Sequence, residues 1–207
     1  MEWLWYLIAY GLGSISFGII ISKYLYQVDI RKYGSNNPGA TNVSVVLGKK
    51  AGFYVLLGDL LKGSISLLIP IIFKADANLL YVGAFAVLGH CFPVWWKFRG
   101  GKAVATSAGV LLVYNPYLLL LTALGAIITI FITRYGYLGS ISIGFILFSY
   151  SLVFDDSKML FFLFVLLLLF LHRSNFFNYL VGSEPKIEMG INTLLSNFSR
   201  KLKKIIL

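Results

Sequence analysis

Charged residues are scarce in this sequence, and acidic residues are the scarcest of them. Only 13% of the 207 residues are charged and 58% are hydrophobic, against about 25% and about 45–50% in ordinary soluble domains. A soluble domain of this length could not bury so much apolar surface, whereas a lipid bilayer accepts it. The net charge is +10, and in such a chain a basic balance must first be read against membrane topology.

Cysteine and histidine are also nearly absent, since the chain has only Cys91, His90 and His172. One cysteine excludes an intramolecular disulfide framework, and this small set does not supply a Cys/His zinc site. The first apolar stretch, residues 3–22, has no basic leading flank and no small-residue cleavage site after it. We therefore expect a membrane span there and not a cleavable secretory signal.

Long apolar runs dominate the rest of the chain. A helix needs about 20 apolar residues to cross the hydrocarbon core. Stretches that fit this rule lie at residues 3–23, 51–73, 77–96, 117–133, 137–154 and 158–172. A shorter run, residues 104–114, is followed by Asn115-Pro116, a natural turn and helix-stop signal. It is either a separate short span or the start of one helix running on to Ile132.

The distribution of charge favours a separate span. With seven helices, fifteen of the eighteen Lys and Arg residues fall on one side of the membrane, including the whole C-terminal tail. Cytoplasmic loops carry such an excess. The other side then holds Glu2, Lys74, Asp76, Asp155, Asp156 and Lys158. We therefore predict an all-α, polytopic membrane protein of seven transmembrane helices, with its N-terminus outside and its C-terminus in the cytoplasm.

Two parts follow from this pattern: a transmembrane domain over 1–189 and a basic tail over 190–207. In the tail, apolar residues recur at helical spacing and Arg200, Lys201, Lys203 and Lys204 supply a polar side. An amphipathic helix on an anionic membrane surface is one interpretation; a frayed basic tail is the other.

The first of three polar segments, residues 29–42, is rich in Gly, Asn, Ser and Thr. Gly34 and Gly39 can take backbone angles that let successive N–H groups converge on an anion, and Pro38 fixes a bend. Further hydrogen-bond donors are Ser35, Asn36, Asn37, Thr41 and Asn42. The segment is either an anion site or an ordinary polar loop between two spans.

The second segment joins residues 89–93 to 97–106. Gly100, Gly101 and Lys102 directly precede an apolar helical run, and a helix N-terminus preceded by glycines is a competent phosphate site. It is not the nucleotide P-loop, because the four-residue spacing between glycines is missing. The alternative is a juxtamembrane basic cluster that only sets topology.

Ionisable residues also occur at the ends of spans and inside one of them. The third polar segment, residues 171–175, stands at the end of the last span and holds His172 and Asn175; histidine there can hydrogen-bond or transfer a proton. Asp59 and Lys62 share one face of the second span at spacing i, i+3. Ionisable groups at membrane depth are functional candidates by default, so we expect either a functional or a structural ion pair.

Together these segments resemble the bacterial acyl-phosphate:glycerol-3-phosphate acyltransferase family of membrane enzymes. The resemblance covers roughly residues 10–186. It rests on the order and spacing of GSISFG, DIRKYGSNNPGATNV, LGKKAG, GDLLKG, GHCFPVWWKFRGGKAVAT and HRSNFFNYLVGSE.

The resemblance implies seven transmembrane helices and an active site that opens to the cytoplasm. It also implies transfer of a fatty acyl group from an acyl phosphate to the primary hydroxyl of glycerol 3-phosphate, in phospholipid biosynthesis. No metal and no cofactor are implied. The expected partners are these two small substrates and membrane lipids. Nucleic acid is not expected, because the basic residues are divided among loops and form no contiguous face.

Roles for individual residues follow from the resemblance, position by position. Ser35 and the amides of residues 36–42 are expected to hold a phosphate, and Lys102 with Gly100 and Gly101 matches the second phosphate-binding motif. The substrate-site residues further include Arg99, Ser140, His172 and Asn175. His90 is expected to orient its loop. We take Ser35, Lys102, His172 and Asn175 as the catalytic set.

The sequence departs from the family pattern at four positions. An arginine that commonly binds phosphate two residues after GATNV is replaced by Val45, and the glycine of GGKGVAT is replaced by Ala103. Tyr137 stands where serine is usual, and Ser174 where an acidic residue is usual. Losing the arginine removes a charge-assisted contact worth about 1.5–3 kcal/mol.

A function from another class uses the same features. A transporter or binding protein for an anionic, phosphorylated lipid intermediate would need the polar loops and the Asp59–Lys62 pair, but no chemistry. Turnover separates the two hypotheses, because only the enzyme releases phosphate in a reaction that depends on glycerol 3-phosphate.

Overall fold

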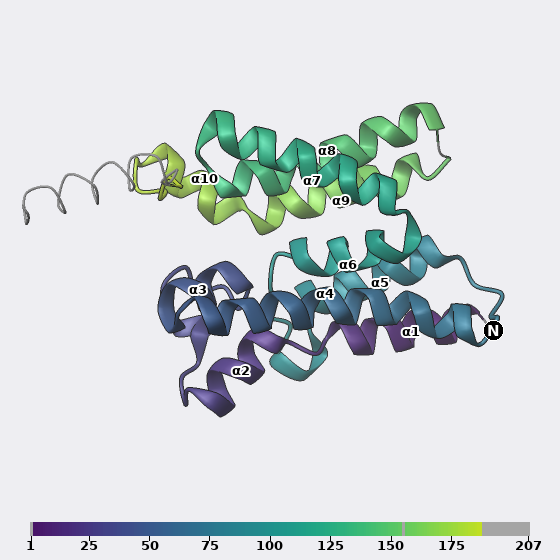
Figure 1. Ribbon diagram of the computed structural model, residues 1–207, viewed down its shortest axis with the longest axis horizontal. Coiled ribbons are helices and arrows are strands. Elements are labelled where there is room, and N and C mark those ends of the chain that lie inside the picture. Colours follow the sequence, from purple (N-terminus) through teal and green to yellow (C-terminus); the bar gives the residue numbers. More distant parts are fainter. Residues whose placement is uncertain (1, 155, 188–207) are drawn as a thin grey trace, which may run out of the picture. The chain divides into compact units, whose positions relative to one another are not determined.

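The computed structural model describes residues 2–154 and 156–187, in which every regular element is a helix (Figure 1). The predicted tail, 190–207, lies outside these ranges. The α-helices are α1 (Glu2–Gly13), α2 (Phe17–Leu25), α3 (Ala40–Leu47), α4 (Lys49–Ile72), α5 (Leu79–Cys91), α6 (Val104–Tyr114), α7 (Pro116–Thr133), α8 (Gly136–Phe154), α9 (Lys158–Leu171) and α10 (Arg173–Leu180). Two 3₁₀ turns, η1 (Ile30–Lys32) and η2 (Val94–Trp96), complete the set.

Five stretches are long and apolar enough to cross a membrane: Glu2–Leu25, Lys49–Ile72, Leu79–Trp96, Pro116–Thr133 and Gly136–Phe154. The pair α9 and α10, bent by 50°, brings the number to six. These stretches confirm an all-α polytopic membrane protein and match the six long apolar runs of the sequence. The seventh predicted span is α6, whose 11 residues cover only about 17 Å at 1.5 Å per residue.

The Asn115-Pro116 pair separates α6 from α7, as its turn chemistry predicts. Asn115 accepts a hydrogen bond from the backbone N–H of Leu118 at 3.1 Å, and Pro116 is the first residue of α7. Proline is favoured there because the first helical N–H would have no intrahelical acceptor in any case. Residues 104–132 are therefore not one continuous helix.

The chain divides into two compact units, Met1–Leu120 and Leu121–Leu207. In the first unit, α4 packs against α1, α3, α5 and α6, and α1 packs along α5. Glycines allow the closest of these approaches. A Cβ on Gly63 would overlap the carbonyl oxygen of Thr106, and a Cβ on Gly109 would overlap that of Leu60. Such small residues are typical of helix interfaces in membranes.

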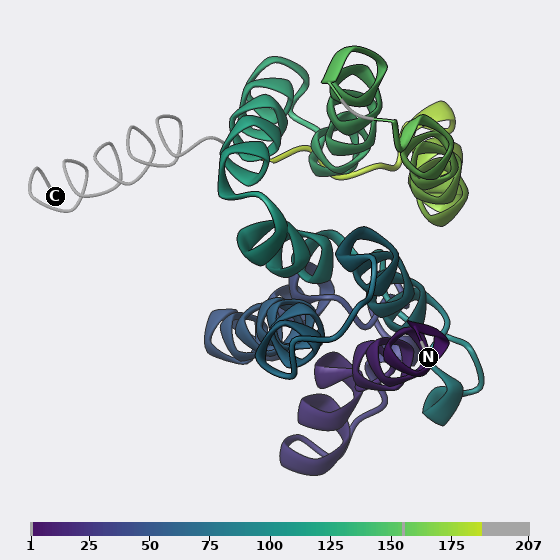
Figure 2. The ribbon, with the colours of Figure 1, turned by 90° about the vertical axis from the view of Figure 1, so that its right-hand side faces the viewer.

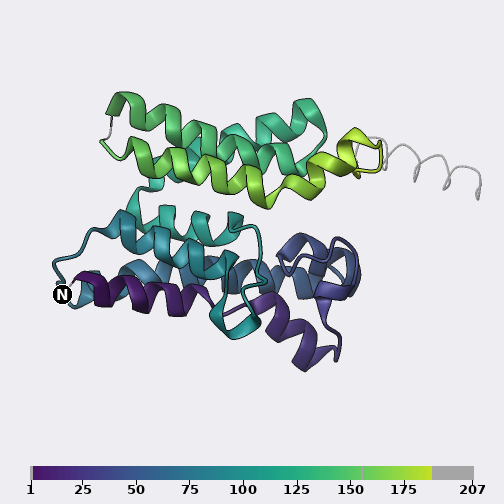
Figure 3. The same cartoon turned by 180° about the vertical axis from the view of Figure 1, so that it is seen from behind.

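The first span is broken, which the sequence did not predict. Residues 14–16 leave the helical conformation between α1 and α2, and α2 departs at an angle to α1 (Figure 3). At the break, Ser14 Oγ accepts a hydrogen bond from the N–H of Val94 at 3.4 Å, which places η2 beside it. The break therefore lies against the segment that leads into the second polar loop.

In the second unit, α7, α8 and α9 lie side by side, and Figure 2 views them nearly end-on. A Cβ on Gly139 would contact Ile130 of α7, and one on Gly144 would contact Leu168 of α9, so α8 lies between the two. After α10 the chain returns to the start of α8, where the N–H of Ile187 donates to the carbonyl of Arg134 at 2.8 Å. This hydrogen bond joins the segment after α10 to the segment that leads into α8.

Candidate active site

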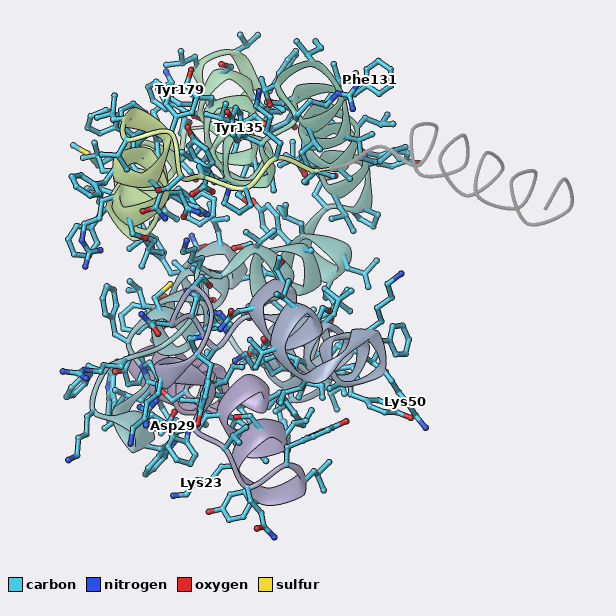
Figure 4. The ribbon with its side chains drawn as sticks, turned by 90° about the vertical axis from the view of Figure 1, so that its left-hand side faces the viewer. Lys23, Asp29, Lys50, Phe131, Tyr135 and Tyr179 are labelled. Atoms are coloured by element: carbon cyan, nitrogen blue, oxygen red, sulfur yellow. The ribbon has the colours of Figure 1, made fainter. Side chains whose placement is uncertain are left out.

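The first polar segment is a loop followed by a helix, and not a loop throughout. It begins at η1, where Asp29 accepts from the N–H of Arg31 at 3.1 Å. It ends in α3, which starts at Ala40 and so includes Thr41 and Asn42. Labelled side chains of this end of the first unit, Lys23, Asp29 and Lys50, are shown in Figure 4.

Asn42 organises this loop from inside. Its Nδ2 donates to the carbonyls of Asn37 and Tyr33 at 2.9 and 3.0 Å, and its Oδ1 accepts from the N–H of Ser35 at 2.9 Å. The side chain is only 6% exposed, so these contacts meet most of its hydrogen-bonding capacity. Gly34 has φ +58° and lies so close that a Cβ would overlap Asn42 Oδ1. Asn42 therefore holds the loop in shape, where we had expected it to contact an anion.

The other predicted residues of this loop divide into two groups. Asn37 accepts from the N–H of Gly39 at 2.8 Å, which stabilises the turn before α3. Ser35, Asn36 and Thr41 are exposed. The exposed group is the one placed to meet a ligand.

An ion pair ties this loop to the second one. Arg31 donates to both carboxylate oxygens of Asp29 at 2.9 Å, and its Nη1 donates to the carbonyl of Trp96 at 3.2 Å. The hydrogen bond from Arg31 holds the pKa of Asp29 below its usual value. Neither residue was predicted to matter, although both stand in the quoted segment DIRKYG.

The second loop folds back onto the end of α5. Lys97 and Phe98 both have φ +58°, which turns the chain sharply after η2. The N–H groups of Gly100 and Gly101 then donate to the carbonyls of Cys91 and His90, each at 3.1 Å. From the sequence we expected these two amides to bind a phosphate. In the structure they donate instead to the last carbonyls of α5, which have no donor within the helix.

The start of α6 supplies the donors that remain. The helix begins at Val104, directly after Lys102 and Ala103, and its first turn presents N–H groups that have no acceptor within the helix. Thr106 and Ser107 are buried in this turn, and their hydroxyl oxygens have no hydrogen-bond partner among the described residues. Sequence reasoning had singled out neither hydroxyl. Arg99 is exposed at the edge of this loop.

Asp59, Lys62 and His90 come together beneath this loop. Lys62 Nζ lies 2.8 Å from Asp59 Oδ1, and His90 Nδ1 lies 3.5 Å from the same oxygen. All three side chains are buried. The sequence predicted the pair on α4 and, separately, an orienting role for His90, but it did not join them.

The second unit holds the remaining predicted residues. His172 forms the joint between α9 and α10, is 3% exposed, and has its Nδ1 2.9 Å from the carbonyl of Leu168. Asn175 donates to Glu184 Oε1 at 2.7 Å. Ser140 donates to the carbonyl of Gly136 at 3.3 Å. Glu184 is a residue without a predicted role that stands in the quoted segment HRSNFFNYLVGSE.

An aromatic cluster lies at the same end of the second unit. The rings of Tyr135 and Tyr179 meet edge to face at 5.2 Å, and Figure 4 shows the two side by side. Tyr137 packs against both at 5.9 and 6.5 Å, and Lys186 Nζ lies 5.8 Å from the ring centre of Tyr135. Tyr137, which stands where the family usually has serine, is thus part of this cluster.

Comparison with known proteins gives a consistent result. The sequence model of the family described as "Glycerol-3-phosphate acyltransferase" matches residues 3–182. Glycerol-3-phosphate acyltransferase 2 of Bacillus cereus is 41% identical over 203 residues, which cover 97% of this chain and 98% of that protein. The glycerol-3-phosphate acyltransferase of Macrococcus caseolyticus is 44% identical over 184 residues, covering 88% and 95%.

Two solved structures match along nearly the whole chain. One is the glycerol 3-phosphate form of PlsY (YgiH), described as an integral membrane glycerol 3-phosphate acyltransferase; it is 35% identical, with a TM-score of 0.82 and coverage of 93% of this chain and 98% of that one. The other is the lysophosphatidic acid form, at 35% identity, a TM-score of 0.78 and coverage of 90% and 95%. The chain therefore belongs to the glycerol-3-phosphate acyltransferase family of integral membrane enzymes.

Proposed function

We propose that this protein transfers a fatty acyl group from an acyl phosphate to the 1-hydroxyl of glycerol 3-phosphate. The products are 1-acyl-glycerol 3-phosphate and inorganic phosphate, in phospholipid synthesis. Related solved structures are described with the acceptor and with lysophosphatidic acid. The observation that carries the proposal is the pair of loops in the first unit, joined by Arg31, because two phosphorylated substrates require two anion sites.

The bonds that change suit a site without an activated nucleophile. The hydroxyl oxygen of glycerol 3-phosphate attacks the acyl carbonyl carbon, and the bond from that carbon to the phosphate oxygen breaks. The electron pair leaves with phosphate, and the hydroxyl proton passes to the departing phosphate or to a neighbouring base. Because phosphate is a good leaving group, catalysis can depend mainly on positioning and on stabilising negative charge.

Residues of both loops have proposed roles in this step. Ser35, with Asn36 and Thr41 on the exposed side of the first loop, binds one phosphate. Lys102, with the first turn of α6, binds the other and stabilises its charge as it departs. Arg99 contributes a further cation at the edge of the second loop. Gly34, Asn37, Gly39 and Asn42 hold the first loop in shape, and Gly100 and Gly101 do the same for the second.

Three residues of the second unit have proposed roles that the family resemblance implies. His172 and Asn175 are proposed catalytic residues, and Ser140 a binding residue for glycerol 3-phosphate. The hydrogen bond from Asn175 to Glu184 fixes which way the amide points, since its Nδ2 is the donor in that bond.

We also propose seven membrane crossings, with the short helix α6 as one of them, an outside N-terminus and a cytoplasmic active site. Support comes from the basic residues, fifteen of which fall on one side only if α6 crosses. Both polar loops of the first unit carry several of these residues.

Turnover by the purified protein in detergent tests the function directly. With palmitoyl phosphate and glycerol 3-phosphate, we expect phosphate release that depends on glycerol 3-phosphate. Lys102→Ala and Ser35→Ala should each lower kcat/KM by about 10-fold or more, since a hydrogen bond to a charged group is worth about 1.5–3 kcal/mol. Lys74→Ala, in the turn between α4 and α5, is the control and should keep wild-type activity.

Binding of glycerol 3-phosphate without phosphate release would support the transporter or binding protein instead. Full activity in both loop variants would refute the assigned residue roles while leaving the reaction in place.

A further inference from the structure

Three ionisable side chains share one buried point in the first unit. Asp59, Lys62 and His90 are 2%, 3% and 6% exposed, and both nitrogen atoms approach the same carboxylate oxygen of Asp59, at 2.8 and 3.5 Å. Two of these residues come from the middle of α4 and the third from the last turn of α5. Removing charges from water costs more than their attraction returns unless further hydrogen bonds are made. Such a cluster at membrane depth is therefore expected to serve more than packing.

On one side the cluster contacts the break in the first span. Lys62 Nζ donates to the carbonyl of Ile15 at 2.6 Å, and Ile15 lies in the non-helical residues between α1 and α2. A helix break leaves carbonyls without intrahelical donors, and this cation supplies one. The helix that follows, α2, touches the first loop so closely that a Cβ on Gly18 would overlap the carbonyl oxygen of Pro38.

On the other side the cluster contacts the second loop. The carbonyls of His90 and Cys91 accept the N–H groups of Gly101 and Gly100. The imidazole itself lies beneath Gly101, because a Cβ added there would overlap His90 Nε2. His90 thus meets the charged pair through Nδ1 and the glycine loop through the opposite edge of its ring.

We propose that Asp59, Lys62 and His90 form a positioning cluster that sets the position and orientation of residues 100–102 for binding a substrate phosphate. The proposal rests on the proposed function of that loop. None of the three residues need touch substrate. The ion pair fixes the imidazole, the imidazole supports Gly101, and the loop places Lys102 and the start of α6. A displacement of about 1 Å in a positioned group can cost about 10²-fold in rate.

Steady-state kinetics distinguish this role from a merely structural one. Gly101→Ala should raise the KM for one of the two phosphorylated substrates by about 10-fold to 100-fold, because the new Cβ displaces the loop. Asp59→Asn and His90→Ala should raise the KM for that same substrate and leave the other KM unchanged. A structural role would lower the folded fraction, and hence the apparent kcat, without this selectivity. Equal changes in both KM values would overturn the proposal.

A double-mutant cycle tests the contact itself. Because the Cβ of Gly101→Ala meets the imidazole, His90→Ala should relieve part of that overlap. The loss in the double variant should then be at least 5-fold smaller than the product of the two single losses. Independent effects of the two substitutions would contradict the proposed support. If His90→Ala does not fold, His90→Asn takes its place, since it also lacks the ring atom that meets Gly101.

Ser64→Ala is the matched control. Ser64 is also buried on α4, but its hydroxyl donates to the carbonyl of Gly109 in α6 and not to the second loop. It should lower the melting temperature and leave both KM values unchanged.

The double-mutant cycle of Gly101→Ala and His90→Ala is also carried out on binding, with the Kd for inorganic phosphate measured by titration calorimetry. Absence of wild-type turnover would refute the proposed function, while the coupling in Kd still tests the cluster.

Discussion

Ala103 has the left-handed backbone conformation, with φ +62° and ψ 1°, directly before α6. The family motif that the sequence resembles has glycine at this position, and glycine adopts such angles without strain. Alanine tolerates them at a cost of about 1–2 kcal/mol, which its buried methyl group, worth about 0.8 kcal/mol, partly offsets. The glycine loop can therefore form with alanine there, but not readily with a larger side chain.

We predict that Ala103→Gly changes the free energy of unfolding by less than about 1 kcal/mol, because relief of strain is balanced by lost burial and a more flexible unfolded chain. Ala103→Val should cost about 2–4 kcal/mol, since a β-branched residue is both strained and too large there. Denaturation of the purified protein in detergent measures both. Ala105→Val, inside the first turn of α6, is the control and should cost under about 1 kcal/mol. Equal losses at 103 and 105 would contradict the role of φ.

Val45 occupies the position of a family arginine and is 77% exposed on α3. Because the side chain has so few neighbours, Val45→Arg should be accommodated without loss of stability. We predict that it raises kcat/KM by about 10-fold or more, since a charge-assisted contact to phosphate is worth about 1.5–3 kcal/mol. The phosphate-release assay measures this. Val45→Gln, which has no charge, should give no comparable rise; equal gains in both variants would rule out the charge as the cause.

At the scale of elements, the Asp29–Arg31 ion pair connects η1 to η2, and both side chains are partly exposed to solvent. Since Arg31 lowers the pKa of Asp29, the pair stabilises the folded protein above the pKa of the unfolded aspartate. That stabilisation is lost as the pH falls through the lower, folded-state pKa. We predict that Asp29→Asn lowers the melting temperature at pH 6, that the difference from wild type begins to shrink only as the pH falls below about 3.9, the pKa of an unfolded aspartate, and that it disappears below the folded-state pKa. Melting curves over this pH range measure it; Asp156→Asn is the control. A difference that stays the same from about pH 4 down to about pH 2 would contradict the ion-pair mechanism.

The helices themselves were largely predictable, because each long one is an apolar run of spanning length and Asn115-Pro116 marks a stop. The break at residues 14–16 was not, since nothing local in GSIS demands it. Its cause is distant in sequence: Lys62 provides a donor for the carbonyl of Ile15, 47 residues away. Likewise, α3 begins within a segment read as loop, because Asn42 folds the preceding residues around itself.

For the site, the residues that gather there could be predicted from the sequence, but the role of each residue could not. The sequence indicated that Asn42, Gly100 and Gly101 belong to phosphate loops, yet their polar atoms stabilise those loops from within. Glu184 received no role because its significance depends on the hydrogen bond from Asn175, which only the turn after α10 creates. Motif spacing shows which residues gather, whereas hydrogen bonding decides which of them face a ligand.

At the scale of the whole molecule, the short helix α6 decides the topology of everything after it. If α6 crosses the membrane, the turn before α9 lies outside and the segment after α10 lies inside; if it does not cross, both are reversed. The positive-inside rule favours the first arrangement, because Arg173, Lys186 and the basic residues of the tail then face the cytoplasm. Helix length alone favours the second, since α6 has only 11 residues.

Single cysteines distinguish these arrangements in a Cys91→Ala background, which removes the one native thiol. We predict that a membrane-impermeant maleimide labels Lys158→Cys in intact cells, but labels Lys186→Cys only after permeabilisation. Both positions are exposed, so accessibility reflects the side of the membrane and not burial. Lys74→Cys and Lys50→Cys are controls for outside and inside, because neither depends on α6. The reverse pattern at 158 and 186 would show that α6 enters and leaves on one side, and the C-terminal segment would then lie outside the cell.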